Sequence, residues 1–298
     1  MKNFCGLVSI VGRPNVGKST LLNRLIEQKI SITSRKSQTT RNNILGIKTK
    51  ENHQMVFIDT PGVHINASKV MNKVLNQSAL GAIEDADLII FMLQRNKINT
   101  LDELILERLR GVETKKICVI NKLDQVASKN SLLPVIEKLR SEYDFAEIIP
   151  VSAKTGKNIN ELENMICQNL PENNHLYDSD TKFLAKESFM ISEIIREKII
   201  RFLGEELPHE TYVQLQKLED KENIINIDAE IIVARESQKG IVVGKNGAKL
   251  KKIGEKARID LEKFFNKKVF LKTWVKTKKN WNNDSDFISS LGIGSLYD

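Results

Sequence analysis

Short apolar runs alternate with longer amphipathic stretches over roughly the first 170 residues. Each stretch between the runs has apolar residues at helical spacing, which predicts a strand and helix alternation. Such an alternation is typical of an α/β domain with a mainly parallel sheet, helices on both faces, and ligands at the carboxyl ends of the strands. The runs expected to form buried strands are CGLVSIV, MVFID, DLIIFML, KICVIN and EIIPVSA.

A different pattern follows a polar, aperiodic stretch, LPENNHLYDSDTK, which is typical of a linker. The next residues predict a long amphipathic helix, two strands, a short helix, a second helix over about 247–265 and a final strand. The sequence therefore predicts a second, α+β domain. The expected division is a first domain at 1–170, a linker at 171–182, a second domain at 183–280 and a tail at 281–298.

The composition is that of a globular protein, with 41% hydrophobic and 28% charged residues in 298. No apolar run is long enough to span a bilayer, and the N-terminus lacks signal-peptide features, so we expect a cytoplasmic protein. Cys5, Cys118 and Cys167 lie in apolar stretches without CxxC spacing. We expect them to be core thiols, with no disulfide and no structural metal.

The formal net charge of +8 is concentrated near the C-terminus. Residues 235–279 hold 15 Lys and Arg against 4 Asp and Glu, a net charge of +11, so the rest of the chain carries −3. A basic segment of this kind indicates a polyanionic partner, either nucleic acid or an acidic membrane surface.

The segment GRPNVGKST fits the phosphate-loop pattern GxxxxGK[ST] and stands between a predicted strand and a predicted helix. Its backbone N–H groups and the helix N-terminus are expected to face phosphates. Lys18 is expected to reach the β- and γ-phosphates, and the Ser19 hydroxyl to ligate Mg²⁺. The nucleotide-binding residues expected here are Gly12, Asn15, Val16, Gly17, Lys18, Ser19 and Thr20.

The segment DTPG ends a predicted buried strand, where the Asp59 carboxylate is expected to hold the metal. Gly62 would let a backbone N–H approach the γ-phosphate. Upstream, SITSRKSQTTRNNI is rich in hydroxyl side chains, and either Thr39 or Thr40 is expected to complete the Mg²⁺ ligands. The expected nucleotide contacts are Asp59, Thr60, Pro61 and Gly62, and the residues expected to act on the γ-phosphate are Lys18, Thr39, Thr40 and Gly62.

Two later segments favour GTP over ATP. In NKLD, the Asp124 carboxylate can accept hydrogen bonds from the ring N–H and the amine of guanine, while Asn121 would tie the loops together. In SAK, the N–H of Ala153 would face the guanine oxygen. The residues expected to bind guanine are Asn121, Lys122, Asp124, Ser152, Ala153 and Lys154.

A second glycine segment, GKNG, lacks the spacing and the hydroxyl of a phosphate loop. Between two predicted helices it matches the GxxG loop of KH domains, which clamps about four nucleotides of single-stranded nucleic acid. The expected RNA contacts are Ile241, Val242, Val243, Gly244, Lys245, Asn246, Gly247, Lys249, Lys251 and Lys252, with Ile231 and Val233 either in the groove floor or in the core.

The order and spacing of GRPNVGKST, SQTTR, DTPG, NKLD and SAK resemble those of translation-factor-class bacterial GTPases. The wording of KISITSRKSQTTRNNILGI and IVVGKNGAKLKKIG is similar to the Era family, over nearly the whole chain. The resemblance implies a P-loop GTPase domain, a type II KH domain, GTP or GDP with Mg²⁺, and a role in 16S rRNA maturation and 30S subunit assembly. It also implies some protein at the inner face of the cell membrane, and we expect a monomer.

Val63 stands where Ras-like enzymes carry the glutamine that orients the attacking water, so slow intrinsic hydrolysis is expected. Asn15 matches an asparagine that binds K⁺ in some related GTPases, and His64 is a further candidate base. Three functions are open: a GTP-dependent RNA-binding switch, which we favour; an RNA-binding protein with structural GTP; and a membrane-surface GTPase.

Overall fold

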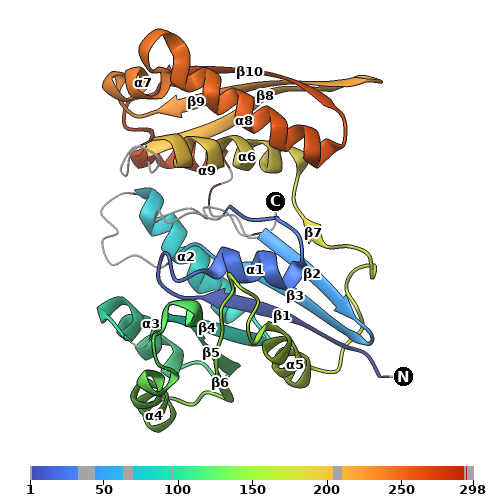
Figure 1. Cartoon of the computed structure of the whole chain (residues 1–298), viewed down its shortest axis with the longest axis vertical. Coiled ribbons are helices and arrows are strands. Elements are labelled where there is room, and N and C mark those ends of the chain that lie inside the picture. The colour runs from blue at the N-terminus through green and yellow to red at the C-terminus, as the bar shows by residue number, and fades with distance from the viewer. Residues whose placement is uncertain are drawn as a thin grey trace.

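The computed structural model describes residues 2–32, 44–62, 70–95, 97–203, 210–291 and 293. Two layered units are stacked along the long axis of the molecule (Figure 1). The N-terminal unit holds a seven-stranded sheet, and the C-terminal unit holds a three-stranded sheet covered by helices.

The large sheet has the strand order β6-β5-β4-β1-β3-β2-β7. The five neighbouring strands from β6 to β3 run parallel, which confirms the predicted mainly parallel sheet. All of their carboxyl ends therefore meet at one edge. The strands are β1 (Phe4–Val11), β2 (Ile44–Lys50), β3 (His53–Asp59), β4 (Leu88–Gln94), β5 (Lys115–Asn121), β6 (Glu147–Pro150) and β7 (Phe183–Leu184).

Helices cover both faces of this sheet, as the alternation of apolar segments predicts. Helices α1 (Lys18–Ile26) and α5 (Ile159–Asn169) share one apolar core with the inward side chains of β1, β3 and β4. On the other face, α2 (Val70–Glu84), α3 (Thr100–Arg110) and α4 (Leu133–Glu142) form a second core. The 3₁₀ turns η1 (Leu123–Gln125) and η2 (Lys129–Leu132) lie between β5 and α4.

The predicted linker is part of the first unit. The backbone N–H of Cys5 donates to the Pro171 carbonyl at 3.1 Å, and the Gln54 side-chain oxygen accepts from Leu176 and Tyr177. Strand β7, placed in the second domain by the sequence, pairs antiparallel with β2 of the first. The boundary at residue 183 is therefore wrong, because backbone hydrogen bonds hold this segment on the large sheet.

The second unit has the predicted order of one helix, two strands, two helices and one strand. Its sheet has the order β10-β9-β8, with β9 parallel to β10 and antiparallel to β8. The elements are α6 (Glu187–Phe202), β8 (Thr211–Asp220), β9 (Ile224–Val233), α7 (Glu236–Val243), η4 (Lys245–Gly247), α8 (Ala248–Phe265) and β10 (Lys268–Thr277). The helices bury one sheet face in a single apolar core.

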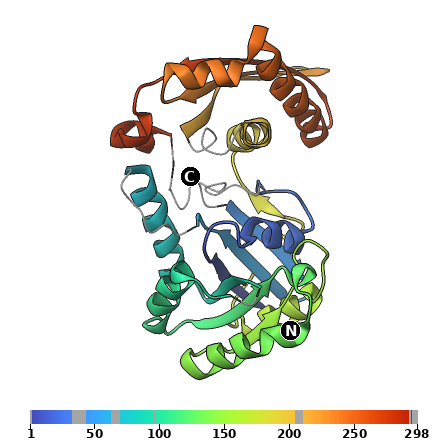
Figure 2. The same ribbon diagram turned by 60° about the vertical axis from the view of Figure 1, so that its left-hand side comes forward.

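The segment predicted as a C-terminal tail joins the two units. It forms η5 (Trp281–Asn283) and α9 (Ser285–Ser290), and α9 lies beside α2 (Figure 2). The indole of Trp281 is fully buried in a cluster with Met71 of α2 and Ile232 of β9. These residues are thus core rather than tail. In the described part of the chain, no helix is both long and apolar enough to cross a membrane.

Candidate functional site

The phosphate loop lies between the end of β1 and the start of α1, at the carboxyl edge of the large sheet. Asn15 and Gly17 have left-handed backbones, with φ of 64° and 110°. A Cβ on Gly17 would stand 2.3 Å from Nδ2 of Asn121, so any other residue would push the NKLD loop away. The glycine therefore permits the close approach of the two loops as well as the turn.

Lys18 is buried beneath the loop. Its ammonium donates to the carbonyl oxygens of Gly12 at 3.0 Å and Arg13 at 3.3 Å. Burial lowers the pKa of Lys18 to about 8, and the charge of Asp59 only partly opposes this shift. A desolvated ammonium gains more from a phosphate than a hydrated one does, because little water has to be removed when the anion binds.

Asp59 ends β3 with a fully buried side chain. Its Oδ2 accepts a hydrogen bond from the Ser31 hydroxyl at 2.7 Å. The hydroxyl of Thr60 donates to the Ile10 carbonyl at 2.8 Å, which ties the start of the DTPG segment to β1. Gly62 packs so closely on the loop that a Cβ there would stand 2.9 Å from the Pro14 side chain.

Asn121 connects three loops at the end of β5. Its Nδ2 donates to the Val16 carbonyl at 2.9 Å, and its Oδ1 accepts from the Ala153 N–H at 3.0 Å. The prediction that Asn121 ties the loops together is confirmed. Lys122 adds a second connection, because its ammonium donates to the Asn15 carbonyl at 2.8 Å.

The Asp124 carboxylate is exposed and oriented by a neighbouring hydroxyl. Its Oδ1 accepts a hydrogen bond from Ser152 Oγ at 2.6 Å, and Ser152 Oγ also accepts from the Thr155 N–H at 3.2 Å. The first bond orients the carboxylate and the second holds the hydroxyl in place, while Asp124 stays exposed to solvent. Such an acceptor fits the two N–H donors of guanine. The Ala153 N–H, predicted to face the guanine oxygen, instead donates to Asn121 Oδ1 in this structure.

Two further side chains brace these loops and have no motif that would reveal them. Arg24 of α1 donates to the carbonyls of Ala153 at 3.2 Å and Lys154 at 2.7 Å. Asn23 accepts from the N–H groups of Ile30 and Ser31 and donates to the Ser31 carbonyl. An Arg in the last turn of the helix after a phosphate loop is a weak signal, and only the tertiary structure shows its target.

Several predicted residues lie outside the described part of the chain. These are the two candidate Mg²⁺ ligands and the two residues after the DTPG segment, namely Thr39, Thr40, Val63 and His64.

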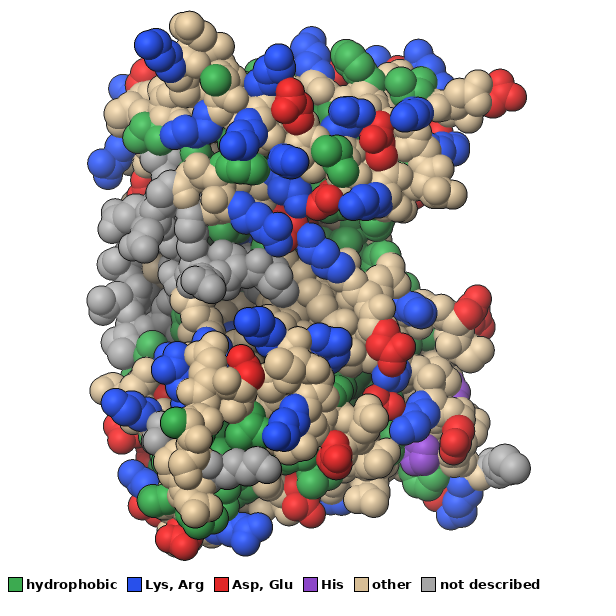
Figure 3. Space-filling model, viewed as in Figure 1, with side chains coloured by type: hydrophobic (Ala, Val, Ile, Leu, Met, Phe, Trp, Pro, Cys, Tyr) green, Lys and Arg blue, Asp and Glu red, His purple; other side chains and the backbone are tan. Residues whose placement is uncertain are grey.

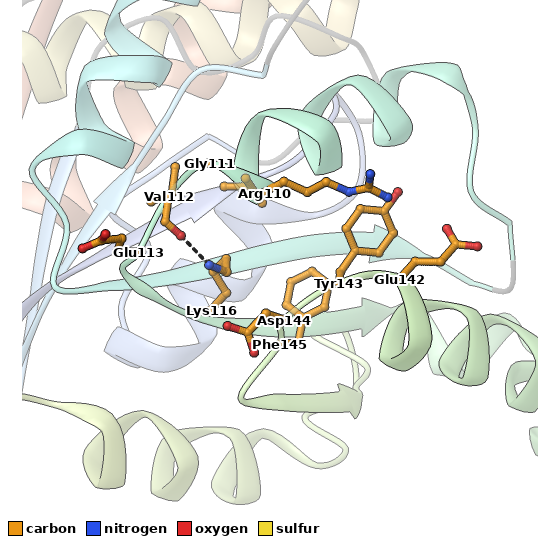
Figure 4. Close-up of a pocket in the computed structure, with 10 residues that line it drawn as sticks. Arg110, Gly111, Val112, Glu113, Lys116, Glu142, Tyr143, Asp144 and Phe145 are labelled. Atoms are coloured by element: carbon orange, nitrogen blue, oxygen red, sulfur yellow. Dashed lines mark hydrogen bonds between the residues drawn. The ribbon is translucent and has the colours of Figure 1, made fainter.

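Among the described residues, one cavity of the first unit lies away from this edge. It has a volume of about 730 Å³ and lies where α3 ends and β5 begins, lined by Arg110, Lys116 and Tyr143 among others (Figure 4). The Lys116 ammonium donates to the Val112 carbonyl at 2.6 Å. Since β5 starts here and ends at Asn121, the cavity is at the opposite end of the sheet from the guanine-facing residues.

The GKNG turn joins α7 to α8 with left-handed backbones at Gly244, Asn246 and Gly247, whose φ values are 73°, 51° and 76°. A Cβ on Gly244 would stand 2.7 Å from the Lys249 side chain, whereas a Cβ on Gly247 would meet nothing within 4 Å. The open space over Gly247 is what a backbone phosphate would need. Lys245 is exposed at the tip.

The predicted apolar groove needs correction. Val242, Ile231 and Val233 are fully buried in the core of the second unit, so they cannot contact RNA. Ile241 is 45% exposed and presents the apolar surface of this helix. The prediction was wrong for Val242 because α7 is amphipathic, so the side chain of Val242 faces the core.

The lysines after the turn point in different directions. Lys249 is half-buried and Lys251 is exposed. The ammonium of Lys252 lies 5.2 Å from the centroid of the Phe202 ring at the end of α6. Lys252 therefore extends the positive surface toward the junction with α6.

Comparison with known proteins shows which family has this fold and these motifs. A family model described as a 50S ribosome-binding GTPase matches residues 7–122, and a KH domain model matches residues 206–282. The chain is 46% identical to the GTPase Era of Haemophilus influenzae over 292 residues, 98% of this chain and 97% of the relative. It is also 46% identical to that of Coxiella burnetii over 290 residues, 97% of this chain and 98% of the relative.

The chain belongs to the Era family of GTPases. A crystal structure of Era with MgGDPNP and nucleotides 1506–1542 of 16S ribosomal RNA is similar to it, with a TM-score of 0.95, 36% identity and coverage of 99% of this chain and 100% of that one. Aquifex aeolicus Era, in a variant bound to GDP.AlF4⁻, gives a TM-score of 0.94 at 36% identity, with the same coverage. The chain is thus a GTP-binding GTPase with a KH RNA-binding domain.

Proposed function

We propose that the chain is a GTP-hydrolysing switch whose nucleotide state controls binding to the 3′ end of 16S rRNA, and that it thereby assists rRNA processing and 30S subunit assembly. The position of Asn121 carries the nucleotide half of this proposal. It joins the phosphate loop to the guanine-facing loop, so base and phosphates are bound by one braced unit.

The small subunit is the better supported target. The model described by 50S binding matches residues 7–122 alone, whereas the Era structure that holds 16S rRNA covers both units of this chain. RNA contact would fall to the GKNG turn, where Gly247 leaves space for a phosphate and Lys245 supplies charge.

The residues fit GTP with Mg²⁺. Ser19 follows Lys18 in the first turn of α1, and Asp59 presents a buried carboxylate at the adjacent strand end. The chain thus supplies the hydroxyl and the carboxylate expected as Mg²⁺ ligands. Thr40 is proposed as the third. Bound Mg²⁺ would neutralise the charge that develops on the phosphates. The chain's own contribution is to orient the phosphates with the loop N–H groups and Lys18.

We propose slow intrinsic hydrolysis, because Val63 has no polar atom to orient water. K⁺ near Asn15 is proposed to supply positive charge in place of an arginine. The Asn15 side chain is exposed on a left-handed turn beside Gly17. Equal single-turnover rates in K⁺ and Na⁺ buffers would remove this part of the proposal.

A contiguous series of contacts supports communication between the two units. Asp59 bonds to Ser31, and Asn23 holds the backbone of Ser31 and Ile30. The residue before Ile30, Lys29, places its ammonium 2.6 Å from Oε2 of Glu197 on α6. A movement of the Asp59 carboxylate would thus change the contact between Lys29 and Glu197, at the junction of the two units.

Glu197 is the centre of that junction. Its carboxylate is 1% exposed and also pairs with Lys198 at 3.0 Å and Arg201 at 2.6 Å. Burial alone would raise the pKa of Glu197, but the hydrogen bonds from Lys29 and Lys198 outweigh it and hold the pKa below its ordinary value. The carboxylate stays charged, and Lys198 in turn pairs with Asp260 on α8, the helix that follows GKNG.

The test compares RNA affinity in the GTP-analogue-bound and GDP-bound protein. We expect different affinities in the two states, and loss of binding in both after Gly247→Asp, whose carboxylate would repel the phosphate. If about five phosphates are contacted, log K should fall with log salt with a slope of roughly −3.5. GTP binding should persist in the variant. Equal affinity in both states would favour the alternative in which GTP is structural.

Peripheral contact with the acidic inner membrane is the other alternative. The same lysine-rich segment, with its +11 charge, would bind anionic lipid by the same electrostatics. Sedimentation with anionic vesicles in competition with RNA separates the two. We expect RNA to displace the protein from the vesicles.

A further inference from the structure

The two faces of β10 differ sharply in chemistry. Val269 and Val275 point toward α8 in the core of the second unit. The alternate positions face the other way, on the side of the sheet without α6, α7 and α8, as the alternation of side chains in a strand requires. We call these positions the β10 outer face: Lys268, Phe270, Lys272, Trp274 and Lys276.

Two aromatic rings on this face are open to solvent. Phe270 is 57% exposed, the highest fraction among the exposed large hydrophobic side chains of the described residues. Trp274 is partly exposed, and its Nε1 donates to Oε1 of Glu230 on the neighbouring strand at 2.9 Å. This bond fixes the indole by its edge and leaves its remaining surface available. Tryptophan rings that are hydrogen-bonded at one edge and open on the rest of their surface are enriched at interfaces.

Two of the three lysines on this face have no ion-pair partner among the described residues. Among the described residues, no carboxylate oxygen lies within 4 Å of the ammonium of Lys268 or Lys272. The Lys272 ammonium instead lies 5.9 Å from the centroid of the Trp274 ring. Lys276 is 3.7 Å from Glu230, and Asp228 is the register neighbour of Lys272 on β9. Positive charge is therefore concentrated along the β10 edge rather than over the centre of the sheet.

The pattern of rings and cations fits single-stranded RNA. Bases stack on aromatic rings without regard to sequence, while lysines between them attract the phosphates. Phe270 and Trp274 are four residues apart, about 13 Å along a strand, with Lys272 midway. A membrane-binding surface would need more apolar area than two rings provide, and a strand-pairing dimer would gain nothing from a line of like charges.

The β10 edge also adjoins the helices that flank the GKNG turn. Strand β10 is the outermost strand of its sheet, and both α7 and α8, which flank the GKNG turn, pack against it. In Figure 3, which views the second unit from its helix side, Lys and Arg side chains lie beside hydrophobic ones up to the upper margin of the molecule. RNA that extends from the GKNG turn can thus reach this edge of the sheet.

We propose that the β10 outer face is a second RNA-contacting surface, on which Phe270 and Trp274 stack bases of the single strand that extends beyond the GKNG groove. The proposal rests on the RNA binding proposed above, but it concerns a different face of the sheet. In this proposal, Phe270, Lys272 and Trp274 contact only RNA that is long enough to extend beyond the GKNG turn.

The chain carries its own reporter for this contact. It has two tryptophans, and Trp281 is fully buried, so quenching of intrinsic fluorescence by a stacked base would come from Trp274. The full chain is titrated with RNA oligomers of about four nucleotides, which fill the groove, and of about twelve. We expect only the longer oligomer to quench the fluorescence.

Three variants sharpen the test. Phe270→Ala and Lys272→Glu should each weaken binding of the longer oligomer about five- to tenfold and leave that of the shorter unchanged. Trp274→Phe should keep most of the affinity but lose the quenching, because phenylalanine still stacks. Leu133→Ala, at a side chain 53% exposed on α4, and Lys115→Glu are the matched controls and should change neither.

The possible results separate the two proposals. If Gly247→Asp abolishes binding of the short oligomer while the outer-face variants bind the long one as wild type does, the KH function stands and the second surface is overturned. If neither oligomer binds, both fail. A dimer in sedimentation velocity that Phe270→Ala dissociates, or binding to anionic vesicles that Phe270→Ala abolishes while RNA binding is unchanged, would also overturn it.

Discussion

The side chain of Asn121 donates to the Val16 carbonyl across 2.9 Å, joining the NKLD loop to the phosphate loop. The same side chain accepts from the Ala153 N–H, so one residue of 3% exposure sets the distance between the phosphate-binding and guanine-binding parts of the site. The absence of a Cβ on Gly17 makes this approach possible.

Replacing Asn121 with alanine should therefore weaken GTP binding about 10- to 100-fold, since it leaves a buried N–H and a buried carbonyl without partners, at about 1–3 kcal/mol. Equilibrium binding of a fluorescent GTP analogue measures the effect. Asn158→Ala is the control, because Asn158 also bonds one carbonyl, that of Pro150, but touches no phosphate-loop residue. Equal losses in both variants would contradict the bridging role.

Asp124→Asn should change which base is bound. The variant keeps the hydrogen bond from Ser152, so the loop is preserved, but its amide group donates where the carboxylate accepted. We expect GTP affinity to fall about 100-fold and xanthosine triphosphate, which carries an oxygen in place of the guanine amine, to bind better than GTP. Unchanged discrimination between the two nucleotides would show that Asp124 does not face the base.

The lowered pKa of Lys18, about 8, makes GTP binding pH-dependent. A bound phosphate favours the charged form of Lys18. At pH values where Lys18 of the free protein is partly deprotonated, nucleotide binding should therefore be coupled to uptake of a proton. Below pH 8 this group is already charged and adds no pH dependence; above pH 8 affinity should fall by up to about tenfold per pH unit. Calorimetry in two buffers of different ionisation enthalpy should find about half a proton taken up at pH 8 and about a tenth at pH 7. No uptake at pH 8 would contradict the account.

Lys29 and Glu197 should transmit nucleotide state to the KH domain. Lys29→Gln is expected to reduce the ratio of RNA affinities between the GTP and GDP states by about 2- to 10-fold, within the 0.5–2 kcal/mol typical of residues between coupled sites. Lys2→Gln is the control, because Lys2 makes an ion pair of similar length, 2.7 Å, with Glu172, remote from the junction. If Lys2→Gln changes the ratio of RNA affinities as much as Lys29→Gln does, the effect comes from the loss of net charge.

A double-mutant cycle with Glu197→Gln separates the direct contact from general loss of charge. If Lys29 acts through Glu197, the second substitution should add little to the first. Additive effects on the ratio would mean that the two residues act independently.

The sequence was sufficient to predict those elements that are marked by a local motif or a continuous apolar run. The phosphate loop, DTPG, NKLD and SAK all fall at the carboxyl edge of one parallel sheet, because each follows a continuous apolar strand. The glycine turn between α7 and α8 was likewise evident from its spacing.

The remainder depends on tertiary contacts. Strand β2 was overlooked although ILGIKTK has apolar positions and forms a hairpin with β3; its other partner, the edge strand β7, is distant in sequence. Arg24 and Asn23 belong to an ordinary amphipathic helix, and only folding shows that they hold the guanine and Ser31 loops. Trp281, expected in a tail, is core because α2 of the other unit covers it.

The most direct test of the central claim, that nucleotide state controls contact with the 3′ end of 16S rRNA, is crosslinking of the GTP-analogue-bound and GDP-bound protein to RNA in cell extract, followed by mapping of both partners. We predict crosslinks from the GKNG turn to that end of the RNA, with yields that differ between the two states and vanish in Gly247→Asp. Equal yields in both states, or crosslinks scattered over unrelated RNA, would contradict it.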